Sequence, residues 1–248
     1  MDTAFFFEVG GSLKIICKQI LLGDSLPEGC TSKKIVFMRI NPEDKKEALK
    51  LIYQKLSDKL WIKRFNKSYI RASYNKRVEK TLSKLENALK LGEDDKITKD
   101  AGEYLVSELS REALINELNY LDIPLAELRK EQKKSNPGFD FHTETDNQII
   151  IFGESKYLSR DNAYGSALSQ IVEFIKDEKD LIELADLEDF VSDDSLGNFE
   201  NGKKGYAAAF SSHSISNQDL LNNILKNKDM QLLYNYEELL LIAVDINE

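Results

Sequence analysis

Apolar residues recur along this chain with two spacings, and each spacing predicts one kind of element. Short apolar runs, or alternating apolar residues bounded by turn residues, are typical of β-strands. Residues at spacings of three and four are typical of amphipathic helices. The predicted strands are two short ones within 3–22 joined around Gly10 and Gly11, 34–40, the arms of a hairpin turning near Asp146 and Asn147, 206–210 and 239–246.

The helical pattern predicts five helices. Asn41 and Pro42 with the acids that follow are expected to open the first one, because proline is tolerated in a first turn and acids suit its positive end. The periodicity continues from there to Leu60. The other predicted helices are 75–91, 99–121, a shorter piece at 125–133, and one that follows a break at Ser159 to Asp161 and runs through Phe174.

The order of these elements predicts an α/β fold. A long helix precedes the hairpin, and another helix and a strand follow it, which indicates a mixed sheet between layers of helices. An acidic turn at 92–95 interrupts the helical periodicity. We therefore predict an N-terminal α+β module at residues 1–95 and a core at residues 96–248.

Composition and charge narrow the class of protein. The chain has 248 residues, of which 42% are hydrophobic and 31% charged, as in ordinary globular proteins. The net charge of −9 does not indicate a nucleic-acid binder, but charge is unevenly distributed. Residues 59–84 hold nine lysines or arginines against one acid, whereas residues 176–200 hold ten acids against two lysines. The acidic stretch is predicted to be a solvated surface excursion, with docking of a basic partner as the alternative.

Cysteine content and hydropathy argue against secretion and against a membrane protein. Cys17 and Cys30 form no CxxC pair, and two histidines cannot complete a cysteine-rich zinc site. The N-terminus has no basic leader, and no apolar stretch reaches the length of a membrane span. We expect a cytoplasmic protein with reduced thiols.

The largest group of potentially catalytic side chains lies in and beside the predicted hairpin. Glu154 and Lys156 occupy positions i and i+2 of a strand, so their side chains share a face, and the hairpin returns Asp140 to their side. Two carboxylates and an ammonium at one strand end are the minimum apparatus for metal-dependent phosphodiester cleavage. The alternative is a surface ion pair, because Glu-x-Lys is common in charged proteins.

This pattern resembles the PD-(D/E)xK nuclease superfamily, although Pro137 precedes Asp140 by three positions instead of one. Gly138-Phe139-Asp140 followed by Gly153-Glu154-Ser155-Lys156-Tyr157 is similar to the small nuclease subunit of the Hachiman anti-phage system. The resemblance covers about residues 100–175. It implies a restriction-endonuclease-like core and a nuclease that works beside a helicase subunit.

The resemblance also suggests roles for individual residues. Asp140, Glu154 and the backbone carbonyl of Ser155 would be ligands of Mg²⁺ (or Mn²⁺), and Lys156 would orient the attacking water or meet the developing negative charge. The superfamily places a further acid on the preceding helix, for which Glu103 is our choice and Glu108 the alternative. RecB-like members carry Gln with Tyr four residues later; here Gln170 is followed by Phe174, so Gln170 is either a substrate contact or a polar residue on the helix flank.

The basic stretch at 59–84 has two interpretations. Basic residues between aromatic ones suit a nucleic-acid backbone with stacked bases, which makes Arg71, Lys76 and Arg77 candidate DNA contacts. A charged helix face beside core aromatics would produce the same pattern. His142, His213 and Tyr157 are interpreted as structural.

The sequence therefore predicts a cytoplasmic, metal-dependent DNA nuclease. The resemblance alone implies that it acts in anti-phage defence and that a helicase partner controls it. Two alternatives stay open at this point: a catalytically inactive, nuclease-like interaction subunit, and a stand-alone restriction-type endonuclease.

Overall fold

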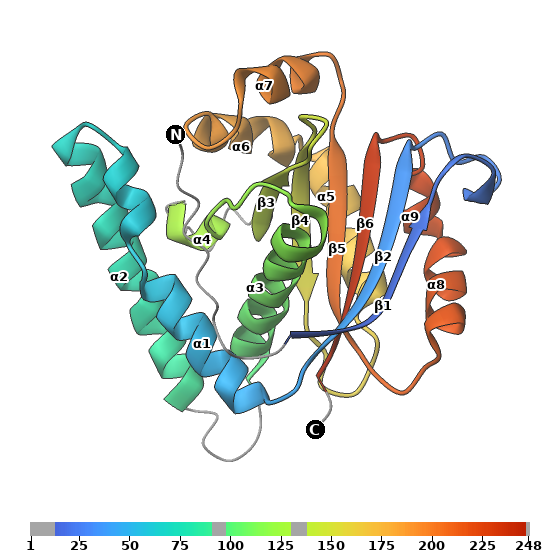
Figure 1. Ribbon diagram of the computed structural model, residues 1–248, viewed down its shortest axis with the longest axis horizontal. Helices are drawn as coiled ribbons and strands as arrows, with labels where there is room; N and C mark the ends of the chain where they lie inside the picture. Colours follow the sequence, from blue (N-terminus) through green and yellow to red (C-terminus); the bar gives the residue numbers. More distant parts are fainter. Residues whose placement is uncertain (1–12, 91–97, 130–137, 247–248) are drawn as a thin grey trace.

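A six-stranded mixed sheet organises the computed structural model, which describes residues 13–90, 98–129 and 138–246 (Figure 1). The strand order is β1-β2-β6-β5-β4-β3. The four central strands are parallel to one another, and the two edge strands, β1 and β3, are antiparallel to their neighbours. The bounds are β1 Leu13–Leu21, β2 Lys34–Pro42, β3 Phe141–Glu144, β4 Ile150–Lys156, β5 Gly205–Ser212 and β6 Glu238–Asp245.

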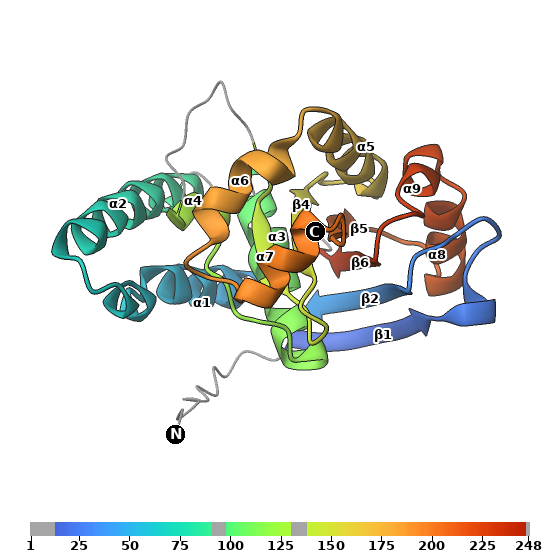
Figure 2. The same ribbon diagram turned by 90° about the horizontal axis from the view of Figure 1, so that it is seen from above.

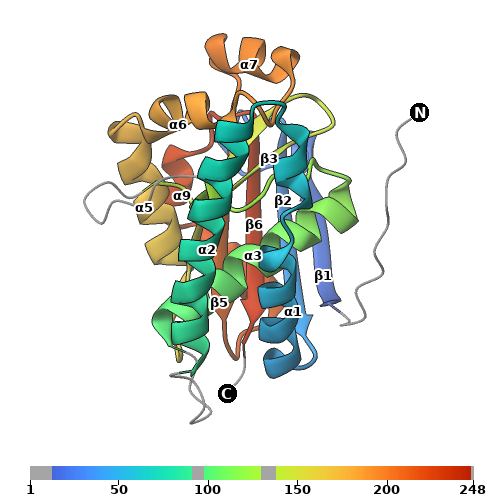
Figure 3. The same cartoon turned by 90° about the vertical axis from the view of Figure 1, so that its left-hand side faces the viewer.

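Helices cover both faces of this sheet (Figures 2 and 3). One layer contains α1 (Lys45–Ser57), α2 (Ser68–Lys90) and α3 (Lys99–Leu118). The other layer contains α5 (Tyr164–Lys176), α8 (Asn217–Leu225) and α9 (Lys228–Leu232). The helices α6 (Lys179–Leu187) and α7 (Asp193–Glu200) contribute Leu187 and Phe199 to the same core. The short α4 (Ala126–Arg129) lies just before the hairpin. No helix in the described ranges is long and apolar enough to cross a membrane.

The central strands explain why two layers of helices are needed. Residues of β2 alternate between the two cores: Ile35 and Phe37 face α5, α8 and α9, whereas Val36 and Met38 face α1 to α3. Every residue of β5 and β6 is buried, as expected for parallel strands covered on both faces. The predicted α/β fold with a mixed sheet between helices is therefore confirmed.

The first helix begins later than predicted. Pro42 is the last residue of β2, where it pairs with Leu13, and so it does not open the helix. Asp44 is the N-cap instead, and its carboxylate accepts a hydrogen bond from Glu47 N. An aspartate cap satisfies a free N–H group of the first turn, which a proline at that place cannot do. The helix ends at Ser57, and Leu60–Arg64 forms a separate 3₁₀ turn.

The acidic stretch at 176–200 was predicted to be a solvated excursion, and this was wrong. It folds into α6 and α7, and Asp180 and Glu183 of α6 are buried. Asp180 accepts hydrogen bonds from Tyr206 Oη (2.6 Å) and from Lys204 Nζ, which compensates the burial of its charge. The helices α8 and α9 were not predicted.

The predicted boundary near residue 95 does not divide the sheet. β2 lies between β1 and β6, and its residues pair with β6 from Lys34↔Glu238 to Ile40↔Val244. Residues before position 95 therefore supply two strands of the same sheet that carries the hairpin. The acidic turn at 92–95 and the predicted strand before Gly10 lie outside the described residues.

Candidate functional site

The candidate site lies where β4 extends beyond its edge partner β3. The register runs from Glu144↔Ile150 to Phe141↔Gly153, so residues 154–156 have no β3 residue opposite them. Asp140 occupies that place: its backbone N–H donates to Gly153 O (2.8 Å), and its Oδ2 accepts from Ser155 N (2.8 Å). On the other side, β5 pairs with the whole segment. The hairpin therefore brings Asp140 beside Glu154 and Lys156, as predicted.

Glu154 and Lys156 form a short ion pair, with 2.5 Å between Nζ and Oε1. The Glu154 side chain is only 2% exposed, whereas that of Lys156 is 19% exposed. Within the described part of the chain, the other carboxylate oxygen, Oε2, is buried and has no hydrogen-bond partner. A buried carboxylate oxygen that accepts nothing is costly and is typical of a position that takes an additional cation or donor.

Glu103 reaches this cluster from α3 because a glycine precedes it. A Cβ atom on Gly102 would lie 2.3 Å from Cγ of Tyr157, so only glycine lets the helix approach the end of β4 this closely. The side chain of Glu103 lies 3.7 Å from Lys99 Nζ. Burial raises its pKa, and the charges of Lys156 and Lys99 counteract that increase. The ring of Tyr157 is buried against α3, in agreement with its structural interpretation.

Glu108, the alternative helix acid, has a different role. It is fully buried and forms an ion pair with Arg111, with 2.9 Å between Nε and Oε2. Its negative charge is therefore already balanced on its own helix. The structure brings Glu103, and not Glu108, into electrostatic contact with Glu154 and Lys156.

Burial, more than the charges within the cluster, favours protonated carboxyl groups. Burial, with smaller contributions from the nearby Glu103 and Glu183, raises the pKa of Glu154 to about 7 against the opposing effect of Lys156. Burial, followed by the charges of Glu154 and Glu127, raises the pKa of Asp140 well above its ordinary value. Burial alone would lower the pKa of Lys156, but the surrounding carboxylates outweigh this effect and raise it, so Lys156 is an ammonium. The cluster thus holds more acidic groups than Lys156 can neutralise.

The residues of the cluster fit a weakly held Mg²⁺ ion. In the described ranges, no three His, Cys, Asp or Glu side chains come together as a metal-binding group. Mg²⁺, however, is commonly held by one or two carboxylates, with waters and substrate phosphates completing its coordination. Asp140 and Glu154 are two such carboxylates, and the unpartnered Glu154 Oε2 is an oxygen that a cation would satisfy. Ser155 lies between them and offers its backbone carbonyl.

A cavity of about 470 Å³ adjoins the cluster. Lys156 lines it from the end of β4, Lys99 from the first turn of α3, and Gln170 from α5. Gln170 thus lines the same cavity as Lys156. This cavity was not predicted, because it depends on how α3 and α5 meet across the end of a strand, which a linear pattern does not contain.

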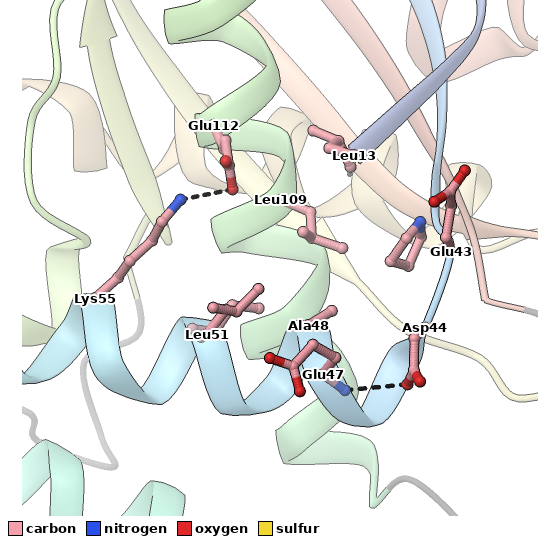
Figure 4. A pocket seen from close by; sticks show the side chains of 11 residues that line it. Leu13, Glu43, Asp44, Glu47, Ala48, Leu51, Lys55, Leu109 and Glu112 are labelled. Atoms are coloured by element: carbon pink, nitrogen blue, oxygen red, sulfur yellow. Dashed lines mark hydrogen bonds and ion pairs between the residues drawn. The ribbon is translucent and has the colours of Figure 1, made fainter. Parts of the chain in front are cut away.

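A second cavity, of about 200 Å³, is separate from the cluster (Figure 4). Its apolar floor includes Leu51 of α1 and Leu109 of α3, and at its side Lys55 pairs with Glu112 (2.8 Å). None of the candidate site residues in the described part of the chain lines it. Glu43, Asp44 and Glu47 also line it, at the start of α1, where Asp44 caps the helix.

The candidate DNA contacts on α2 are not part of the carboxylate cluster. Arg71 donates to Phe65 O (2.7 Å) and Arg77 donates to Arg129 O, so both guanidinium groups bind the chain itself. Lys76 is exposed. Three aromatic residues of the basic stretch at 59–84 pack on Phe190 instead of facing solvent: Trp61, Phe65 and Tyr74. The core-aromatic interpretation of this segment accounts for them.

His142 belongs to a buried polar network that the sequence did not reveal. Arg129 Nη2 lies 2.8 Å from His142 Nδ1, and His142 Nε2 lies 2.9 Å from Glu183 Oε2. A guanidinium only donates hydrogen bonds, so Nδ1 accepts and Nε2 carries the hydrogen that Glu183 accepts. Glu183 also accepts from the backbone N–H of Phe139, the residue before Asp140. His142 is therefore structural, and its network fixes the start of β3.

His213 also has a structural contact, since its Nε2 lies 3.0 Å from Leu158 O.

Comparison with known proteins gave no relative: no family model, no curated protein and no solved structure matches this chain.

Proposed function

We propose that this chain is a metal-dependent deoxyribonuclease that hydrolyses phosphodiester bonds. The supporting observation is the meeting of Asp140, Glu154, Lys156 and Glu103 at the end of β4, with one buried carboxylate oxygen lacking a partner among the described residues. Structural ion pairs normally balance their charges, whereas this cluster has an excess of acid beside an open cavity.

The role that we propose for each residue of the cluster follows from the charge that it carries. Asp140, Glu154 and the carbonyl of Ser155 would hold Mg²⁺ (or Mn²⁺), which when bound neutralises negative charge on the phosphate and lowers the pKa of a bound water. Lys156 holds a proton beside the acids and presents a positive charge to the cavity, where it would orient water or stabilise the developing charge. Glu103 adds negative charge on the α3 side.

We further propose that the enzyme is an effector of anti-phage defence and that a helicase subunit controls its access to DNA. This part of the proposal is supported by the resemblance of residues 138–140 and 153–157 to the Hachiman nuclease subunit. The net charge of −9 agrees with it, because such a chain attracts free DNA only weakly.

The test is cleavage of linear and circular DNA with Mg²⁺, with Mn²⁺ and with a chelator. Asp140→Asn, Glu154→Gln and Lys156→Ala are expected to lower the cleavage rate by about 100-fold or more. Asparagine can still accept the hydrogen bond from Ser155 N, so Asp140→Asn removes the charge without opening the end of the strand.

The matched controls are the exposed residues Glu200 and Lys176, as Glu200→Gln and Lys176→Ala. Both controls should cleave like the unmodified protein. Undiminished metal-dependent cleavage by folded Glu154→Gln and Lys156→Ala would exclude this site. If the unmodified protein neither cleaves DNA nor binds Mg²⁺ in calorimetry, with and without the helicase, the chain is an inactive interaction subunit.

A further inference from the structure

The cavity beside the carboxylate cluster is lined by lysine, serine, glutamine and glutamate side chains. Three elements line it: Lys99 of α3, Lys156 of β4, and one side of α5. Lys156 belongs both to the cavity and to the cluster, where its Nζ lies 2.5 Å from Glu154 Oε1. A molecule in the cavity therefore lies next to the candidate reaction centre.

Most of the side chains that line the cavity are polar, and they supply two kinds of chemistry. Lys99 and Lys156 supply two ammonium groups, suited to a phosphate. On α5, Ser166, Ser169 and Gln170 supply hydroxyl and amide groups, suited to the sugar and base edges. Glu173 also lines the cavity and repels phosphate, so the phosphate is expected beside the two lysines.

The size of the cavity limits what can enter it. Its volume of about 470 Å³ lies within the range of roughly 300–1,000 Å³ that is common for sites of small molecules. A base within a duplex is stacked between its neighbours and cannot enter such a cavity unless it leaves the stack. An unpaired nucleotide can enter without that cost.

We propose that this cavity binds one unpaired nucleotide of a DNA strand beside the scissile phosphate, with Lys99 as a phosphate-binding residue, so that the substrate is single-stranded DNA. This inference rests on the proposed nuclease function and specifies its substrate. It assigns roles to Lys99, Ser166 and Ser169 that the sequence pattern did not suggest.

The first experiment measures binding without cleavage. Fluorescence anisotropy in chelator would compare a labelled single-stranded oligodeoxynucleotide with the duplex of the same sequence. We expect the single strand to bind about tenfold more tightly. Ser169→Tyr fills the cavity from an exposed position and should weaken single-strand binding by about tenfold, and Lys99→Ala by about threefold.

The controls place the same changes elsewhere. Asn223→Tyr on α8 and Lys176→Ala at the end of α5 are exposed and do not line the cavity, so they should bind like the unmodified protein. Circular dichroism and thermal unfolding should show that all four variants are folded. Equal affinity for duplex and single strand, or normal single-strand binding by folded Ser169→Tyr, would overturn the proposal.

The second experiment separates this inference from the nuclease proposal. Cleavage of single-stranded and duplex DNA is measured with Mg²⁺ for the unmodified protein and for Ser169→Tyr. Cleavage that Ser169→Tyr retains in full contradicts the nucleotide site and leaves the nuclease standing. Cavity-dependent single-strand binding by a protein that cleaves nothing supports the nucleotide site and contradicts the nuclease.

Discussion

Glu154 is the residue on which the chemistry of the site depends most. Its carboxyl group is 2% exposed, and burial moves its pKa from the ordinary value of 4.5 to about 7. The folded protein therefore binds this proton more tightly than the unfolded chain does. The resulting stabilisation is complete below about pH 4.5 and is lost as the pH rises to about 7.

This residue predicts how the stability of the metal-free protein depends on pH. Between pH 5 and 8, Glu154 should lower the free energy of unfolding by up to roughly 3 kcal/mol, as its buried carboxyl group ionises. Glu154→Gln cannot ionise and should lack this part of the pH dependence. Urea unfolding in chelator at several pH values measures it, with exposed Glu200→Gln as the control. Parallel pH profiles for Glu154→Gln and the unmodified protein would contradict the assignment.

At the scale of elements, the approach of α3 to β4 creates both the cluster and the cavity. Gly102 permits the contact with Tyr157, and the neighbouring position on the helix carries Glu103. A helical glycine normally costs about 1 kcal/mol relative to alanine, so its presence at this contact is a packing requirement.

Gly102→Ala should destabilise the protein, because the added methyl group would overlap the buried ring of Tyr157. The free energy of unfolding in urea is expected to fall by about 1–3 kcal/mol. DNA cleavage is expected to fall as well, because α3 would move and carry Glu103 away from the cluster. Gly197 of α7 is the matched control, since nothing lies within 4 Å of a Cβ added there. Gly197→Ala should be neutral or stabilising by up to about 1 kcal/mol. A neutral Gly102→Ala would show that the ring moves aside at little cost.

The exposed lysines of α2 provide a separate prediction about DNA binding. Lys76→Glu with Lys80→Glu should weaken binding and flatten its dependence on salt, because fewer phosphate contacts release fewer counterions. Arg71 and Arg77 are left unchanged, because reversing their charges would also break hydrogen bonds to backbone carbonyls. Titrations at several salt concentrations measure the slope. An unchanged slope would identify this face as a solvated surface.

At the scale of the whole molecule, the net charge of −9 disfavours unaided capture of DNA. The isolated chain is therefore expected to degrade intact duplex DNA slowly, and a helicase partner with ATP should increase the rate. Co-purification with a helicase that is encoded beside this protein, followed by cleavage assays with and without ATP, tests this. Rapid degradation of duplex DNA by the isolated chain at physiological salt would favour a stand-alone endonuclease.

The sequence predicted those parts of the molecule that depend on nearby residues. The hairpin and the place of Asp140 follow from spacing along one strand and one turn, and both were confirmed. Contacts between distant segments were not predictable. The ten acids of 176–200 suggested solvent exposure, yet Asp180 and Glu183 are buried because partners from other elements bind them. The place of β2 inside the sheet also depends on a distant strand.

The pairing of β2 with β6 has a consequence for how the protein is made. β2 precedes β6 in the chain by most of the described sequence, so the ribosome synthesises β2 well before its partner β6. Until then, only β1 can pair with β2, and the other edge of that strand stays open to unwanted partners. Completion of the sheet must therefore wait until β6 has been synthesised, and loss of β6 would separate β1 and β2 from the strands that carry the site.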